Sequence, residues 1–141
     1  SPLLQNTERS DWLAERNNNL GYTILEDGHP QVAIKLIEVA LMNNPDNPYA
    51  LDSKGWALYQ LGKPAEGLPW IARSMDILRE REEAGDSKAR RPLYESLVHT
   101  GEIHWVLGDK AKAEQFWQQA EAFMPESSMA DDTRRRLKMD E

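Results

Sequence analysis

Two series of glycines recur along the chain with the same spacing. In both series the successive members are 34 and then 46 residues apart, and the second series follows the first by seven residues. The first series is Gly21, Gly55 and Gly101, and the second is Gly28, Gly62 and Gly108. A fixed period of this length indicates stacked copies of one supersecondary unit. The longer interval predicts an insertion of about 12 residues between the second and third copies.

Small and large apolar residues follow the same register, which indicates helices. A small residue stands five positions after each glycine of the second series, and a large apolar residue stands four positions further on. The small residues are Ala33, Gly67 and Ala113, and the large ones are Ile37, Ile71 and Trp117. Small side chains at helical spacing allow two helix backbones to approach closely. Each copy is therefore expected to be a pair of tightly packed helices.

Turn and capping residues predict seven helices and no strand. The expected ranges are 10–26, 30–43, 48–60, 64–84, 92–107, 110–123 and a last helix that begins at Ser127 or Ser128. Asn47 is expected to cap the third helix, because it precedes a proline that fits the first helical turn. Pro69 lies inside the fourth helix and should bend it. Arg79 stands where a proline closes the first and third copies, so this helix is expected to continue into the insertion.

These residues resemble the pattern of the tetratricopeptide repeat family, W-x2-L-G-x2-Y followed by A-x3-F and a proline. The first copy offers Leu20, Gly21, Ile24, Ala33, Ile37 and Pro45, the second offers Leu51, Gly55, Leu58, Gly67 and Ile71, and the third offers Leu97, Gly101, Ala113, Trp117 and Pro125. Four positions depart from the pattern, and they are Asn17, Lys54, Thr100 and His104.

The resemblance implies one domain over residues 1–141, an all-α tetratricopeptide superhelix of antiparallel helix pairs. The implied repeats span about 14–47, 48–81 and 94–127, with an extended-helix insertion at about 82–93 and a capping helix at about 127–138. Three units and an end helix are about the minimum that forms a continuous core. The chain begins with Ser1, so we expect it to be a fragment of a longer protein.

The composition disfavours several kinds of partner and site. The 141 residues carry a net charge of −7, which disfavours electrostatic binding to nucleic acid or to anionic lipid. No apolar run approaches the roughly 18 residues of a membrane-spanning helix. No cysteine is available as a disulfide partner, metal ligand or nucleophile. The basic cluster at 134–138 is expected to form a polar capping face, and no cofactor or metal ion is expected.

No residue pattern typical of an enzyme is present in the sequence. Phosphate-binding glycine loops, nucleophile elbows and zinc-binding helix motifs are absent. A helix would point His99 and His104 about 140° apart, so the two could not share a metal ion. We expect His99 to face solvent and His104 to be half-buried. The carboxylates at 80–83 and 131–132 lie beside arginines and are expected to form solvated, ion-paired helix faces.

The resemblance also implies that the first helix of each repeat presents one face to a concave groove. The positions are three before, one after and four after the glycines of the first series. They hold Asn18, Tyr22 and Leu25, then Asp52, Trp56 and Tyr59, then Val98, Glu102 and Trp105. Aromatic side chains on such a face combine apolar area with a hydrogen-bonding edge, as recognition hot spots do. The three remaining tryptophans are expected to pack between helices, and they are Trp12, Trp70 and Trp117.

The predicted function is a protein-interaction scaffold whose groove binds a partner peptide or helix. Asp52 and Glu102 lie beside the aromatic positions, so the expected partner is apolar or aromatic with basic flanks. Family members that clamp the carboxylate terminus of a chaperone use Lys, Asn and Arg at defined groove sites. Only Asn18 fits that set, so this binding mode is not expected. The alternative is a structural or self-associating segment whose groove is filled by its own chain or by a second copy.

A second, weaker resemblance concerns the source of the chain. The segments at 20–23, 51–59 and 101–105 are similar to the C-terminal repeats of large bacterial proteins of this family. That similarity suggests a soluble domain on the cytoplasmic or periplasmic side of a bacterial envelope protein.

Overall fold

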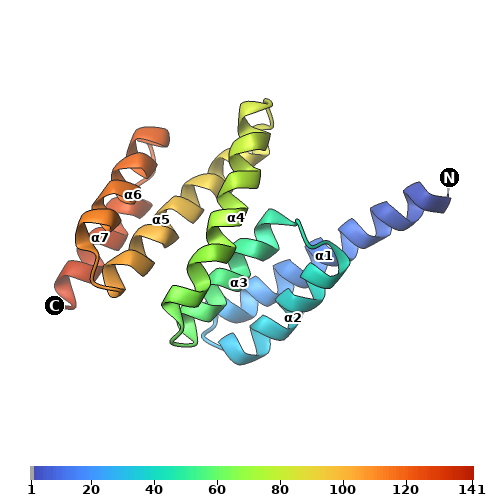
Figure 1. Cartoon of the computed structure of the whole chain (residues 1–141), viewed down its shortest axis with the longest axis horizontal. Helices are drawn as coiled ribbons and strands as arrows, with labels where there is room; N and C mark the ends of the chain where they lie inside the picture. Colours follow the sequence, from blue (N-terminus) through green and yellow to red (C-terminus); the bar gives the residue numbers. More distant parts are fainter. Residues whose placement is uncertain (1) are drawn as a thin grey trace. The chain divides into compact units, whose positions relative to one another are not determined.

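The computed structural model describes residues 2–141, with side chains described from Glu8 onward except at Ser10. These residues form seven α-helices and one short 3-10 helix, with no strand (Figure 1). The elements are α1 (Pro2–Glu26), α2 (Pro30–Asn43), α3 (Pro48–Gln60), α4 (Pro64–Glu83), η1 (Ser87–Ala89), α5 (Arg90–Val106), α6 (Lys110–Phe123) and α7 (Met129–Met139). The expected all-α class is confirmed.

Two helix starts differ from the sequence-based expectation. α1 begins at Pro2 instead of near residue 10, because the leucines, glutamine, glutamate and arginine between them are good helix formers. α5 begins at Arg90, two residues before Pro92, because the 3-10 helix η1 leads directly into it. α4 runs through Pro69 to Glu83 as one helix. The bend expected at this proline stays a prediction.

The residues of the predicted insertion lengthen the two helices that flank it. α4 has 20 residues and α5 has 17, whereas α2, α3 and α6 have 13 or 14. Gly85, with φ of +95°, follows α4, and Asp86 caps η1 by accepting a hydrogen bond from the Lys88 amide. The insertion therefore extends a helical hairpin. The repeat boundaries themselves stay a prediction.

The helices fall into two compact units, which are described separately. Unit 1 comprises the residues up to Ile77, and unit 2 comprises Leu78–Glu141. In unit 1, α1 packs against α2, and α3 packs against both. Its core contains Leu25, Ala33, Ile37 and Ala57, with a second cluster of Ala14, Ala40 and Ala50.

Helix pairs approach so closely at the glycines of the first series that a methyl group would not fit. A Cβ atom at Gly55 would lie 2.6 Å from the Gly67 carbonyl oxygen of the facing helix. A Cβ atom at Gly101 would lie 2.3 Å from Nε1 of Trp117. These contacts explain why small residues recur with the repeat period.

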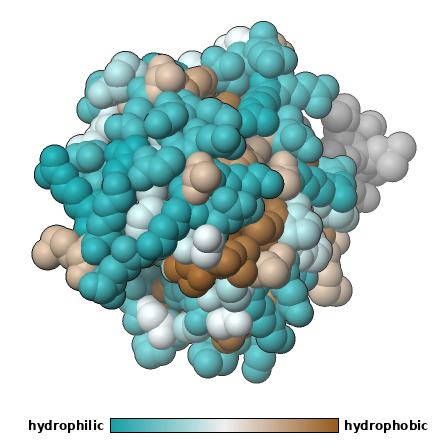
Figure 2. Space-filling view, turned by 60° about the vertical axis from the view of Figure 1, so that its left-hand side comes forward, coloured by the Kyte–Doolittle hydropathy of each residue, from teal (hydrophilic) through white to brown (hydrophobic). Residues whose placement is uncertain are grey.

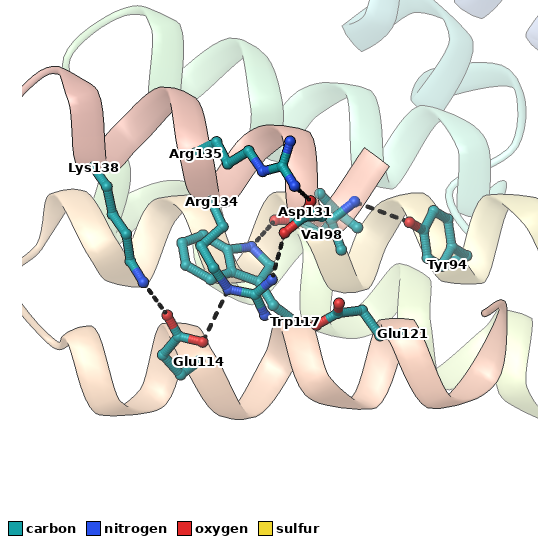
Figure 3. Close-up of polar contacts among 10 residues, drawn as sticks. Tyr94, Val98, Glu114, Trp117, Glu121, Asp131, Arg134, Arg135 and Lys138 are labelled. Carbon is teal, nitrogen blue, oxygen red and sulfur yellow. Dashed lines mark hydrogen bonds and ion pairs between the residues drawn. The ribbon is translucent and has the colours of Figure 1, made fainter. Parts of the chain in front are cut away.

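In unit 2, α5 packs against α6, and α7 packs against both. Trp117 and Tyr94 are fully buried in this unit, and the indole N–H of Trp117 donates to the Val98 carbonyl at 3.3 Å. The Tyr94 hydroxyl accepts from the Ala130 amide at 3.0 Å, which fixes the first turn of α7 against α5 (Figure 3).

Two expectations about burial are wrong. Trp12 does not pack between helices: it is 56% exposed, stands beside Arg16, and lines an open surface hollow of about 300 Å³. Its neighbours on the helix surface, Glu15, Arg16 and Asn19, are exposed as well, so Trp12 lies on the solvent-facing side of α1. His99 does not face solvent but is 6% exposed, because α5 is buried along most of its length in unit 2.

Candidate functional site

In unit 1 the predicted groove positions lie along one side of α1 and of α3. On α1, Asn18 and Leu25 are buried and Tyr22 is half-buried. Residues four apart on a helix are neighbours on its surface, so Asn18 and Tyr22 are adjacent. Leu25 is a member of the core cluster of unit 1, so its side chain supports the face from below.

On α3, Asp52, Trp56 and Tyr59 are all half-buried. The Trp56 and Tyr59 rings stack, with centroids 4.7 Å apart and planes inclined by 30°. Trp56 also packs against the core cluster that contains Leu25. The structure thus brings residues of α1 and α3 together around Trp56, which is anchored and still partly exposed.

Asn18 carries an unusual polar atom. Its side chain is 5% exposed, and its Oδ1 atom has no hydrogen-bond partner among the described residues. Leaving a buried acceptor unsatisfied costs about 1–3 kcal/mol. The neighbouring Asn17 is different, because its Nδ2 donates to the Leu13 carbonyl at 2.9 Å. Asn18 is therefore a buried acceptor positioned where a hydrogen-bond donor would be favourable.

In unit 2 the corresponding positions are covered by α7. Val98 is fully buried and Glu102 is 5% exposed. The Glu102 carboxylate accepts a hydrogen bond from Nη2 of Arg136. Trp105 is half-buried, with the ammonium groups of Lys110 and Lys138 4.8 Å and 5.9 Å from its ring centroid.

Arg134 holds the centre of this contact between α6 and α7 (Figure 3). Its guanidinium donates to Glu114 at 3.1 Å and to Glu121 at 2.6 Å, and it lies 5.5 Å from the Trp117 ring centroid. The hydrogen bond to Glu121 raises the pKa of Arg134, with a further contribution from Glu114 against the effect of burial. The side chain is only 15% exposed. Lys138 adds an ion pair with Glu114 at 3.3 Å.

The sequence interpretation missed these inward-facing cations, because it placed the whole basic cluster on the outer face. Arg135 does point outward: it is 73% exposed and pairs with Asp131 of its own helix. The sequence did hold a signal for this contact. Arg136 follows Glu102 by 34 residues, which is the repeat period, so the two occupy equivalent positions in successive units. Tyr22 and Trp56 are related by the same interval.

Other kinds of site find little support in the described part of the chain. The residues with described side chains include no group of three or more His, Cys, Asp or Glu that could hold a metal ion. Among the described residues, no helix is both long and apolar enough to cross a membrane. The face shown in Figure 2 is mainly hydrophilic, with apolar surface gathered near its centre.

Comparison with known proteins supports the fold. No family model and no curated protein matches the sequence. Among solved structures, the TPR domain of Arabidopsis FLU is similar with a TM-score of 0.68 and 21% sequence identity. The match covers 84% of this chain and 99% of that chain. The chain therefore has the fold of a tetratricopeptide repeat domain.

Proposed function

We propose that the chain is a non-catalytic interaction module that binds a segment of a partner protein on the α1–α3 face of unit 1. The single observation that carries the proposal is the buried, unsatisfied Oδ1 atom of Asn18. A bound segment would supply an N–H group to this acceptor. A hydrogen bond formed only in the complex favours binding without stabilising the free protein.

The surroundings of Asn18 suit an apolar or aromatic segment with basic flanks. The stacked rings of Trp56 and Tyr59 offer rigid apolar area, and Tyr22 lies one turn from Asn18. Asp52 on α3 provides negative charge for a basic flank. The positions that the sequence predicted for the third repeat, Val98, Glu102 and Trp105, belong to unit 2 and are not part of this face.

A second candidate function is that of a structural or self-associating segment of a larger protein, whose groove is filled by its own chain or by a second copy. The observation that favours it is the coverage of the third repeat's groove positions by the chain's own α7. A bacterial envelope protein as the source, and either side of that envelope as the location, also remain proposals.

Selection of binding peptides tests the interaction function. The full chain is used to select from a random-peptide phage library, and enriched peptides are measured by fluorescence anisotropy against Asn18→Leu. We expect the binding affinity to fall about five- to twelvefold, since a hydrogen bond worth about 1–1.5 kcal/mol is lost. The free energy of unfolding should stay the same or rise, because the unsatisfied acceptor is removed.

Asn17→Leu is the matched control, because it makes the same change at the adjacent residue, whose amide is already bonded to Leu13. We expect it to keep peptide binding. Failure to enrich any peptide, or equal loss of binding in both variants, would contradict the proposal. A concentration-dependent dimer in light scattering without peptide binding would favour self-association instead.

A further inference from the structure

The surface of unit 2 that α7 covers is acidic and aromatic. Three carboxylates of α5 and α6 pair with cations of α7. They are Glu102, Glu114 and Glu121, and we call them the acidic face. The pairs that Glu114 forms with Arg134 and Lys138 are drawn in Figure 3. The rings of Trp105 and Trp117 lie within 6 Å of cationic groups of α7. The covered surface therefore has the chemistry of a receptor for a cationic helix.

Few buried side chains and several partly exposed ion pairs hold α7 in place. Ala130, Thr133 and Leu137 of this helix are buried and Met129 is half-buried, so Leu137 is its one large apolar side chain that is buried. Its cations contact the acidic face from Arg134, Arg136 and Lys138. Ion pairs at partly exposed positions contribute little each. An isolated helix of 11 residues is also marginal in water. Among the helices of unit 2, α7 should therefore be the easiest to release.

Release of α7 would leave a surface that still requires a cationic occupant. The Glu102 side chain is 6% exposed with α7 in place, and any occupant that covers it again must offer it a cation, because burying an unpaired carboxylate is costly. The Tyr94 hydroxyl would lose the Ala130 amide, and the Trp117 ring would lose the guanidinium beside it. These groups define the ligand: cations spaced as at 134, 136 and 138, a leucine as at 137, and small residues as at 130 and 133.

We propose that the acidic face is a docking site for a basic amphipathic helix of a partner protein, and that α7 is its built-in, displaceable competitor. The α7 of a second copy is the less favoured occupant. It would form the same contacts as the tethered helix while losing the translational freedom of one molecule. A partner helix with additional cations or a larger apolar face would bind the acidic face more tightly than α7 does. This site uses only residues of unit 2 and does not depend on the proposed function of the α1–α3 face.

The test uses the full chain and a synthetic, fluorescently labelled peptide of residues 127–141 as the probe. In the chain, Arg134→Glu combined with Arg136→Glu places like charges against the acidic face and undocks α7. We expect the peptide to bind this variant about tenfold or more tightly than the wild type, because a tethered helix competes at a millimolar effective concentration. The variant should bind the peptide one to one.

Two controls isolate the chemistry of the site. Arg135→Glu in the chain should behave as the wild type, since Arg135 pairs only within α7 and points outward. A peptide that itself carries Arg134→Glu and Arg136→Glu should not bind. Absence of binding to a variant that keeps its α-helical circular dichroism would overturn the proposal. A variant that forms dimers in light scattering and excludes the peptide would overturn the choice of a partner helix.

A second measurement keeps the proposal testable if the double variant does not fold. Hydrogen exchange of α7 amides is followed in the wild-type chain as unlabelled peptide is added to millimolar concentration. We expect exchange of the α7 amides to accelerate while the amides of α5 and α6 keep their protection. Unchanged exchange of α7 at saturating peptide would show that α7 is a fixed structural element and would overturn the proposal.

Discussion

At the scale of single residues, each glycine of the first series faces a large apolar side chain of the neighbouring helix. Gly21 and Gly55 face isoleucines, whereas Gly101 faces the ring of Trp117. The distances leave no room for a β-carbon at Gly101. The effect on stability of adding a methyl group at the glycine should therefore depend on the size of the facing side chain, and this coupling energy can be measured.

We predict that Gly101→Ala destabilises the protein by about 1–3 kcal/mol, because the added methyl group overpacks a closed helix contact. In a Trp117→Phe background the cost of the same change should be smaller, since the smaller ring leaves space. Urea unfolding of the four proteins measures the coupling energy directly. Equal costs in the two backgrounds would show that the contact with the indole is not the cause.

His104 makes stability depend on pH. Its ring stacks on Phe116 with centroids 5.5 Å apart, and its pKa is lowered from the usual 6.5 by burial, then by Lys112, against a smaller opposite effect of Asp109. The unfolded chain therefore binds a proton at a pH where the folded protein does not. Stability contributed by the neutral ring is complete well above pH 6.5 and is lost as pH falls from there toward the lower folded pKa.

We predict that the free energy of unfolding falls between pH 7.5 and pH 5.5, and that His104→Gln reduces this fall. Urea unfolding across this range gives the slope, and NMR titration of the ring gives the folded pKa of His104. His29→Gln is the control, because that exposed histidine follows α1 outside the packed helices. A folded pKa of His104 at or above 6.5 would contradict the prediction.

At the scale of elements, the helices differ in how their first turn is completed. Asn47 caps α3, with its Oδ1 accepting from the amides of Tyr49 and Ala50 at 3.0 Å and 3.1 Å. Ser128 precedes α7, and within the described residues its side chain makes no capping hydrogen bond. The side chain of the residue before the helix thus caps the first turn of α3 but not that of α7.

We predict that Asn47→Ala costs about 1 kcal/mol, because two amides of the first turn lose their acceptor at a buried site. Asn47→Asp should retain most of the stability. Ser128→Ala is the matched change before α7, where the Ser128 side chain caps no amide and donates to Asp132 at an exposed site. It should alter stability by only a few tenths of a kcal/mol. Thermal unfolding followed by circular dichroism distinguishes the three variants. A similar loss in both alanine variants would contradict the assignment of the cap.

At the scale of the whole molecule, contacts gather within two units, and α4 contributes residues to both. In stacked repeats each unit contacts only its neighbours, so stability approximates a sum of local and interface terms. Damage within one unit should therefore be felt first in that unit.

We predict that Gly101→Ala accelerates hydrogen exchange in α5, α6 and α7 more than in α1, α2 and α3. Gly55→Ala should produce the reverse pattern, because its β-carbon would meet Ile71 and the Gly67 carbonyl within unit 1. Mass spectrometry of exchanged peptides resolves the two patterns. A uniform rise along the chain in both variants would show that the two units unfold together.

The sequence alone predicted the repeat, the helix class and the ends of most helices. These features depend on local signals: prolines at first turns, turn glycines, capping side chains, and small residues at a fixed period. The start of α5 was less well predicted because no strong punctuation stands at Arg90. The start of α1 was missed although Pro2 is a proline of the kind that opens a first turn. The same register predicted which positions of α1, α3 and α5 share one side of each helix.

Only the tertiary structure decided which of those positions are accessible. Periodicity assigns a side chain to a face, but burial depends on which other helix covers that face. Trp12 is exposed on the solvent-facing side of α1, and His99 is buried inside unit 2. The Oδ1 atom of Asn18 is enclosed without a hydrogen-bond partner among the described residues. Likewise, Arg136 of α7 contacts Glu102 because the chain folds back after α6. The ion pair joins residues that are distant in the sequence.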